Sequence, residues 1–170
     1  EDECGECGGD GSSCACTPGD VNGDSIINVQ DIIVTISYIL ESDVSNFDAD
    51  CADLNSDGTI NVQDIVQMVT VIIGSRTADA TEASLIKVGN ALNLDADGYI
   101  GAVQMTLSHG ADFSIELTDK AMVADYRTNG NETTLIIVVP ESDELLIANG
   151  EYEIVDLIVV NSADIMDVNI

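Results

Sequence analysis

A twelve-residue pattern occurs twice in this chain and constrains its fold more than any other feature. The first copy spans residues 20–31 and the second, 33 residues on, spans residues 53–64, with eight of the twelve positions identical. Side chains that carry oxygen stand at positions 1, 3, 5, 9 and 12 of each copy. Calcium takes roughly six to eight oxygen ligands and tolerates irregular geometry, so this spacing is typical of a calcium-binding loop. Two copies in register predict two such loops.

Each predicted loop is followed by an apolar stretch with the periodicity of a helix. The apolar residues of the second stretch lie 33 residues after those of the first: Ile32, Ile33, Ile36, Ile39 and Leu40, then Ile65, Val66, Val69, Ile72 and Ile73. No helix is expected before either loop, so each unit is a loop with an exiting helix. Neither helix can bury its apolar face alone, and we expect the two to pack antiparallel about a pseudo-twofold axis.

The charge of the chain excludes several classes of partner. The chain carries 32 acidic residues against 4 lysines and arginines, a formal net charge of −28. Nucleic acids and anionic membranes repel such a surface, whereas divalent cations are attracted to it. Hydrophobic residues nevertheless make up 45% of the chain, which argues for folded cores and against a disordered acidic tail. No apolar run has the length of a membrane-spanning helix, so membrane insertion is not expected.

The five cysteines indicate an oxidising location, secreted, extracellular or at a cell surface. They are Cys4, Cys7, Cys14, Cys16 and Cys51. Cys16 and Cys51 each lie shortly before a predicted loop, and we expect a disulfide between them that fastens the two repeats together. Three cysteines then remain near the N-terminus, so one of them is odd and either free or joined to another chain. The alternative is a four-thiolate zinc site built from Cys4, Cys7, Cys14 and Cys16.

From residue 83 onward the sequence changes from helical to strand periodicity. Candidate strands separated by turn signals cover residues 84–94, 99–108, 113–117, 122–128, 133–139, 145–147, 151–160 and 165–170. Many short strands at this spacing predict a β-sandwich. The expected fold class is therefore α+β, a pair of calcium loop-helix units plus a small all-β sandwich. The expected parts are a cysteine-rich arm (1–16), a calcium-binding domain (17–76), a linker (77–82) and the sandwich (83–170).

Residues 17–76 resemble a type I dockerin module, whose hallmark is the repeat Asp-x-Asn-x-Asp-Gly-x-Ile-Asn-x-x-Asp. The resemblance implies two bound Ca²⁺ ions and tight binding to a cohesin, a β-sandwich partner of the same or another chain. It implies equivalent ligands in the two loops: Asp20, Asn22, Asp24, Ile26 through its carbonyl, Asn28 and Asp31, then Asp53, Asn55, Asp57, Thr59, Asn61 and Asp64. Partner recognition falls on positions 10 and 11, which are Val29, Gln30, Val62 and Gln63. Because the dipeptide is the same twice, such a module can dock in either of two orientations.

The two loops differ at position 6, which is Gly58 in loop two but Ser25 in loop one. The sharp turn at this position needs a positive φ angle, which favours glycine. Gly23, at position 4 of loop one, is not expected to compensate for the serine. We therefore expect loop one to bind calcium more weakly than loop two.

The second half of the chain is similar to a cohesin-like or immunoglobulin-like sandwich, a resemblance that is carried by residues 94–104. Asn93, Asp95 and Asp97 have the spacing of a further calcium loop, but Gly101 and Gln104 stand where its remaining ligands belong. A hairpin turn is therefore favoured here over a third ion.

These features favour a non-catalytic assembly protein, a homo-oligomer or polymer. A dockerin-like module and a sandwich on one chain supply two complementary binding surfaces. Contact between these surfaces on successive chains would build a head-to-tail filament. The alternative is an anchor that ties a larger secreted protein to a separate cohesin scaffold, which the resemblance associates with polysaccharide-degrading complexes. Catalysis is not expected, because the only histidine, His109, lies beside a predicted turn and no nucleophile or phosphate-loop motif occurs.

Overall fold

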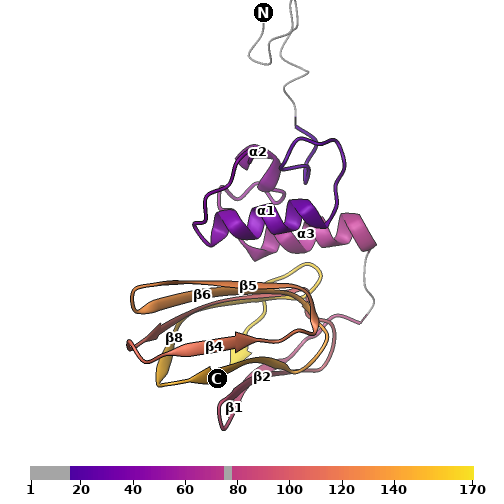
Figure 1. Cartoon of the computed structure of the whole chain (residues 1–170). Helices are drawn as coiled ribbons and strands as arrows, with labels where there is room; N and C mark the ends of the chain where they lie inside the picture. Colours follow the sequence, from indigo (N-terminus) through magenta and orange to yellow (C-terminus); the bar gives the residue numbers. More distant parts are fainter. Residues whose placement is uncertain (1–15, 75–77) are drawn as a thin grey trace, which may run out of the picture.

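A helical module lies on one face of a two-layered β-sandwich (Figure 1). The computed structural model describes residues 16–74 and 78–170. The helices are α1 (Val29–Ile39), α2 (Ala49–Ala52) and α3 (Val62–Ile73). The strands are β1 (Ala83–Val88), β2 (Ala91–Ala96), β3 (Ala102–His109), β4 (Ser114–Leu117), β5 (Ala121–Asn129), β6 (Glu132–Pro140), β7 (Glu144–Asn149), β8 (Tyr152–Val160) and β9 (Val168–Asn169). The α+β fold class confirms the prediction from the sequence.

Helices α1 and α3 begin with the same N-terminal cap, because the repeat places the same two residue types there. The Asn28 side chain accepts a hydrogen bond from the Gln30 backbone N–H (2.7 Å), and the Asp31 carboxylate accepts one from the Asn28 N–H (2.8 Å). Asn61 and Asp64 form the same reciprocal capping box at the start of α3. The caps therefore start each helix within the last four residues of a predicted calcium loop.

The two long helices run in opposite directions and share one apolar core (Figure 1). Their buried residues in that core are Ile32, Ile36, Leu40, Val62, Ile65, Val66, Met68 and Val69. Most of the apolar residues that the periodicity indicates are buried there, but Ile33 and Ile73, which were expected on the same faces, are each 40% exposed. The antiparallel pair expected from the repeat is thus the arrangement that the structure shows.

A short helix that was not expected precedes loop two. The Asp48 side chain accepts hydrogen bonds from the backbone N–H groups of Asp50 (3.0 Å) and Cys51 (3.3 Å), which starts α2. The helix is four residues long and its C-terminal cap is Asp53, the first residue of loop two. The expectation that no helix precedes either loop is therefore wrong for loop two.

The sandwich consists of a five-stranded sheet in the order β4-β7-β2-β1-β9 and a four-stranded sheet in the order β5-β6-β3-β8. Paired strands are antiparallel except β1 and β9, which pair in parallel. Along β3 the side chains alternate between the two faces of the four-stranded sheet. Val103 and Met105 lie in the core between the sheets, whereas Ala102 lies in the core that is shared with the helices.

Three of the sequence expectations for the sandwich are wrong in detail. Residues 84–94 form two strands rather than one, because Gly89, with a φ of 62°, and Asn90 turn the chain between β1 and β2. The turn at Asp97 and Gly98 joins β2 to β3, which belong to different sheets, so it is not a hairpin. In the predicted strand 165–170, only Val168–Asn169 form a strand.

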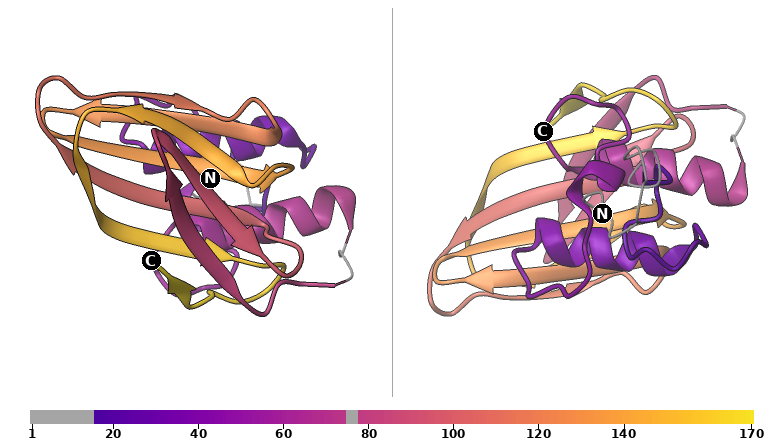
Figure 2. Two further views of the ribbon diagram at one scale, coloured as in Figure 1. Left: turned by 90° about the horizontal axis from the view of Figure 1, so that it is seen from below. Right: turned by 90° about the horizontal axis from the view of Figure 1, so that it is seen from above.

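The helices cover the outer face of the four-stranded sheet (Figure 2). One buried apolar cluster contains residues of α1 and α3 together with Ala102, Ile136, Val138, Val139 and Val160 of the sandwich. A second cluster fills the space between the two sheets. The chain therefore has two cores, and the first of them joins the helical module to the sandwich.

Candidate calcium loops and docking surface

Loop one folds around the side chain of its first residue. The Asp20 carboxylate accepts hydrogen bonds from the backbone N–H groups of Asp24 (3.1 Å) and Ser25 (2.9 Å). The Asp24 carboxylate accepts one from the Ile26 N–H (2.8 Å), and the Asn22 side-chain oxygen accepts one from the Asp24 N–H (2.9 Å). These bonds hold the oxygen-bearing side chains of positions 1, 3 and 5 on one tight turn.

Loop two repeats these bonds at the equivalent positions. The Asp53 carboxylate accepts from the N–H groups of Asp57 (3.2 Å) and Gly58 (2.9 Å). The Asp57 carboxylate accepts from the Thr59 N–H (2.8 Å), and the Asn55 side-chain oxygen accepts from the Asp57 N–H (3.0 Å). The two loops therefore share one hydrogen-bonded conformation, although their sequences differ at positions 2, 4, 6 and 7.

Each loop places positions 4 and 6 in the left-handed region and supplies one glycine and one serine for them. In loop one these positions are Gly23 (φ 72°) and Ser25 (φ 70°). In loop two they are Ser56 (φ 58°) and Gly58 (φ 82°), the same residue types in the opposite order. A side chain at positive φ is strained relative to glycine. The backbone thus gives loop one no particular disadvantage, because loop two carries a comparable strain at position 4.

Ser25 and Ser56, the serines with positive φ in the two loops, provide a test of this loop geometry. Ser25→Gly and Ser56→Gly are each expected to raise the free energy of unfolding by about 0.5–1 kcal/mol, because glycine relieves the strain of a positive φ. Urea unfolding in excess calcium measures this change. Ser45→Gly is the matched control, since Ser45 is exposed and is not among the residues with positive φ. A gain in the control as large as in Ser25→Gly would contradict the strain argument.

The acid at position 12 is fully buried in both loops, as Asp31 and Asp64. The Asp64 carboxylate accepts hydrogen bonds from the backbone N–H groups of Leu54 (2.9 Å) and Asn61 (3.0 Å). Burial nevertheless raises the pKa of Asp64 above its usual value, although the backbone hydrogen bonds oppose this shift. This observation and the all-oxygen character of the loops fit calcium, a hard cation.

The residues assigned by analogy to calcium ligation are thus brought together within each loop. In loop one they are Asp20, Asn22, Asp24, Ile26, Asn28 and Asp31, and in loop two Asp53, Asn55, Asp57, Thr59, Asn61 and Asp64. Each loop carries three carboxylates, and like charges within one loop repel one another. A bound calcium ion would supply the positive charge that offsets this repulsion.

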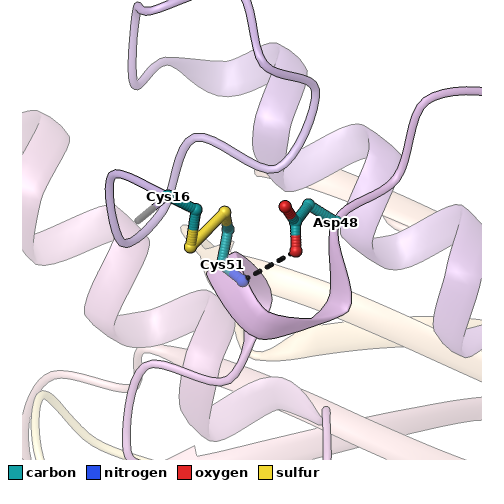
Figure 3. A group of neighbouring side chains, drawn as sticks. All are labelled: Cys16, Asp48 and Cys51. Carbon is teal, nitrogen blue, oxygen red and sulfur yellow. Dashed lines mark hydrogen bonds between the residues drawn. A yellow bond between two sulfur atoms is a disulfide. The ribbon is translucent and has the colours of Figure 1, made fainter. Parts of the chain in front are cut away.

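Outside the two loops, three potential metal ligands lie close together: Cys16, Asp48 and Cys51 (Figure 3). Their donor atoms lie within 4.8 Å of one another. The two sulfurs, however, are joined in a disulfide with a Cα–Cα distance of 5.6 Å. Asp48 caps α2 by accepting from the Cys51 N–H. This cluster is therefore a cross-link beside a helix cap. The four-thiolate zinc alternative is wrong, because it needs Cys16, which is bonded to Cys51; its other members, Cys4, Cys7 and Cys14, lie outside the described residues.

The helical module corresponds to a known family. Residues 18–72 match the family model of the dockerin type I domain. The helical module is dockerin-like. Dockerin domains bind calcium and associate with cohesins, and the all-β part of the chain agrees with the cohesin-like sandwich expected from the sequence. No curated protein and no solved structure matches the chain. Residues 18–72 are called the dockerin module below.

The residues predicted to recognise a partner have the same identities in both repeats but differ in exposure. Val29 is 38% exposed, whereas its counterpart Val62 is fully buried. Gln30 is exposed and Gln63 is half-buried. The two copies thus differ in exposure, and the helix that follows the second copy makes the larger contact with the sandwich.

Helix α3 makes that contact, and it packs against strands β3, β6 and β8. Val66 lies on Gly101, where an added Cβ would come within 2.8 Å of a Val66 methyl group. The Arg127 guanidinium on β5 donates a hydrogen bond to the Leu40 carbonyl at the end of α1 (3.2 Å). This cation suits the negative end of a helix whose last turn has no basic residue. Sequence analysis missed Gly101 and Arg127 as contact residues, because only the fold brings them to the helices.

At the third calcium site considered from the sequence, the Asp97 carboxylate is hydrogen-bonded to residues 81 and 82. The Asp97 side chain accepts hydrogen bonds from the backbone N–H of Glu82 (2.9 Å) and from both the N–H and the hydroxyl of Thr81. These bonds, led by that from Glu82, lower the pKa of Asp97 to about 2. Asp97 thus holds residues 81–82 against the β2–β3 turn. This role favours a turn over a third calcium ion at this segment.

Asp97 also gives a prediction for pH dependence. Its folded-state pKa lies below the usual value of 3.8, so its contribution to stability is present above about pH 4 and is lost as the pH falls towards about 2. Relative to Asp97→Asn, the wild-type chain should be more stable at pH 6, and the difference should shrink across this window. Thermal unfolding at a series of pH values measures the difference. A difference that is independent of pH between 6 and 2 would contradict the assignment.

The His109 side chain contacts neighbouring residues through both ring nitrogens and through its ring face. Its Nε2 atom is 2.8 Å from the Thr133 hydroxyl oxygen and its Nδ1 atom is 2.8 Å from the Gly110 carbonyl oxygen. Its ring stacks on Phe113 with ring centroids 4.0 Å apart. Both ring nitrogens are therefore occupied by neighbours at the end of β3, in agreement with its interpretation as a residue beside a turn.

Proposed function

We propose that this chain is a non-catalytic, calcium-dependent association module in which dockerin helices bind the outer face of a cohesin-like sheet. The observation that carries the proposal is the buried apolar contact between α3 and strands β3, β6 and β8. Association of dockerins with cohesins supports it. The disulfide and the calcium loops favour an extracellular or cell-surface location. None of the helices in residues 16–74 and 78–170 is long and apolar enough to cross a membrane.

Two calcium ions, one in each loop, are part of the proposal. The twelve ligand residues named above would hold them through carboxylate, amide and main-chain oxygens. Loop two ends at Asp64, within the first turn of α3, and Val62 of the same turn is buried against the rest of the core. Calcium in loop two would therefore hold the start of the helix that contacts the sheet, which is why we expect docking to depend on calcium.

The head-to-tail filament expected from the sequence would make this same contact between successive chains. In the structure the contact lies within one chain, which leaves neither the sheet nor α3 free for a neighbour. A filament then needs exchange of helices between chains, as in domain swapping. We propose the closed monomer as the ground state and the exchanged polymer as its alternative.

Sedimentation velocity in millimolar calcium, and then in excess chelator, tests the proposed function. A compact monomer in calcium that becomes slower-sedimenting and expanded in chelator is the expected result. Large species in calcium that dissociate in chelator would instead support the filament. A hydrodynamic shape that is identical in both solutions would contradict calcium-dependent docking.

A separate cohesin scaffold remains the second candidate partner, and one observation favours it. Val29 and Ile33 on α1 are exposed, whereas their counterparts on α3, Val62 and Val66, are buried, and Val66 lies against Gly101 of the sandwich. The dockerin module thus retains an apolar surface of the type that docks. Under this alternative the chain is an anchor, and binding of a cohesin to the wild-type chain, with loss of binding in Ile33→Asp, is the measurement that supports it.

A further inference from the structure

The dockerin module carries two surfaces with nearly the same sequence but opposite exposure. The α1 surface consists of Val29, Gln30 and Ile33, and the α3 surface consists of Val62, Gln63 and Val66, each 33 residues on. Ile33 is 40% exposed, whereas Val66 is 1% exposed. By the symmetry of the repeat, either surface has the chemistry to face the sheet. Something outside the module must therefore select the α3 surface.

The observed orientation places the two ends of the helices at different parts of the sheet. Leu40 at the end of α1 is bonded to Arg127 on β5, and Glu41 lines a shallow pocket with the same arginine. In sequence, Gly74 corresponds to Glu41. A half-turn of the module about its pseudo-twofold axis would exchange these positions and bring Gly74 beside Arg127.

The connection to the sandwich does not allow this half-turn. Only residues 75–77 separate Gly74 from Ala78, so the two Cα atoms are at most about 14 Å apart. Ala78 is fixed on the sandwich, because its carbonyl accepts a hydrogen bond from the Tyr99 N–H (2.9 Å) and the adjacent Asp79 accepts one from the Ser162 N–H (3.1 Å).

The half-turn would move Gly74 farther than the connection can reach. Helix α3 has 12 residues and is therefore about 18 Å long, and its axis lies about 8–10 Å from that of a packed neighbour. Exchange of the two helices displaces Gly74 by about 20 Å. In Figures 1 and 2 the C-terminal end of α3 and the start of the sandwich segment lie at the same side of the molecule, so the displacement leads away from Ala78.

We propose that the chain's own sandwich is the docking partner of its dockerin module, and that the three-residue tether selects the α3 surface over the α1 surface. A short tether gives the internal sheet an effective concentration on the order of millimolar. The α3 surface is then closed to cohesins of ordinary affinity, and only the α1 surface faces the solvent. This inference rests on the proposed docking function and specifies its partner and orientation.

The first test compares Val66→Asp with Ile33→Asp, which place the same charge at equivalent positions of the two helices. Small-angle X-ray scattering of the full chain in millimolar calcium measures the radius of gyration. Val66→Asp is expected to open the molecule and increase the radius, because it buries an unpaired charge against the sheet. Ile33→Asp is expected to leave the radius unchanged. An unchanged radius in Val66→Asp would overturn docking through the α3 surface.

The second test lengthens the tether by about 20 Gly and Ser residues after Gly74, which gives a root-mean-square reach of about 26 Å and permits the half-turn. With this tether, Val66→Asp should close again through the α1 surface, and Val66→Asp combined with Ile33→Asp should stay open. If Val66→Asp with the long tether stays open, the α1 surface is not equivalent and tether selection is wrong.

Calcium titration of each variant separates this inference from the proposed function. If Val66→Asp leaves both calcium binding and calcium-dependent compaction intact, tether-selected docking fails while calcium-dependent association stands. If the wild-type chain itself is expanded in calcium, the proposed docking function fails first.

Discussion

Removal of calcium is expected to destabilise the dockerin module by about 8 kcal/mol when the free calcium concentration is a thousand times the dissociation constant. Each bound ion contributes about 4 kcal/mol under that condition, and we propose two ions. The direction follows from the loops, because each carries three carboxylates and one of them, Asp31 or Asp64, is buried. The helices should then lose structure while the sandwich, which has a separate inner core, stays folded.

Calorimetry in calcium and in chelator measures this effect, and isothermal titration counts the ions. Asp24→Ala and Asp57→Ala, at position 5 of loops one and two, should each reduce the stoichiometry from two to one. Asp112→Ala is a suitable control, because Asp112 is exposed and lies outside both loops. If the two loop variants leave calcium binding and thermal stability unchanged, residues 17–76 do not bind calcium as proposed.

Removal of the Cys16–Cys51 disulfide should lower the free energy of unfolding by about 4 kcal/mol. The bond links residues 35 positions apart, and the loss of loop-closure entropy in the unfolded chain gives this value. The variant with Cys16→Ala and Cys51→Ala is preferable to a reductant, which would also act on the other cysteines. Urea unfolding in excess calcium measures the change. A loss below about 1 kcal/mol would show that contacts between the repeats, rather than the covalent link, restrict the unfolded chain.

The features that could be predicted from the sequence are those with a local cause. The two loops, the caps at Asn28 and Asn61 and the helices that follow are all specified by residues close together in the chain. The turn at Gly89 and Asn90 also has a local signal, the Gly-Asn pair between two strand-like segments. Short α2 likewise had its signal in Asp48, an N-cap residue.

The features that escaped prediction depend on long-range placement. Val29 and Val62 occupy the same position of the repeat, so no local rule distinguishes the exposed residue from the buried one. On α3, Val66 lies on Gly101, a surface without a side chain, and we propose that the short tether selects this orientation. Arg127 is 87 positions from Leu40 in sequence, and only the fold shows that it binds the end of α1. The conformation of the two loops thus depends on nearby residues, whereas the docking surface does not, and calcium binding by the loop residues stays a prediction.

The disulfide has a mechanical consequence for a chain under tension. A pull between the residues before Cys16 and the sandwich would pass through the sulfur bond to Cys51 and bypass the segment between them. That segment contains loop one and α1, and its 35 backbone steps would otherwise add about 120 Å of extended chain. The load would instead fall on loop two and α3, which are anchored on the sheet. While the disulfide is intact, the first repeat therefore carries no load. Reduction of the disulfide would let the segment between Cys16 and Cys51 extend under the same force.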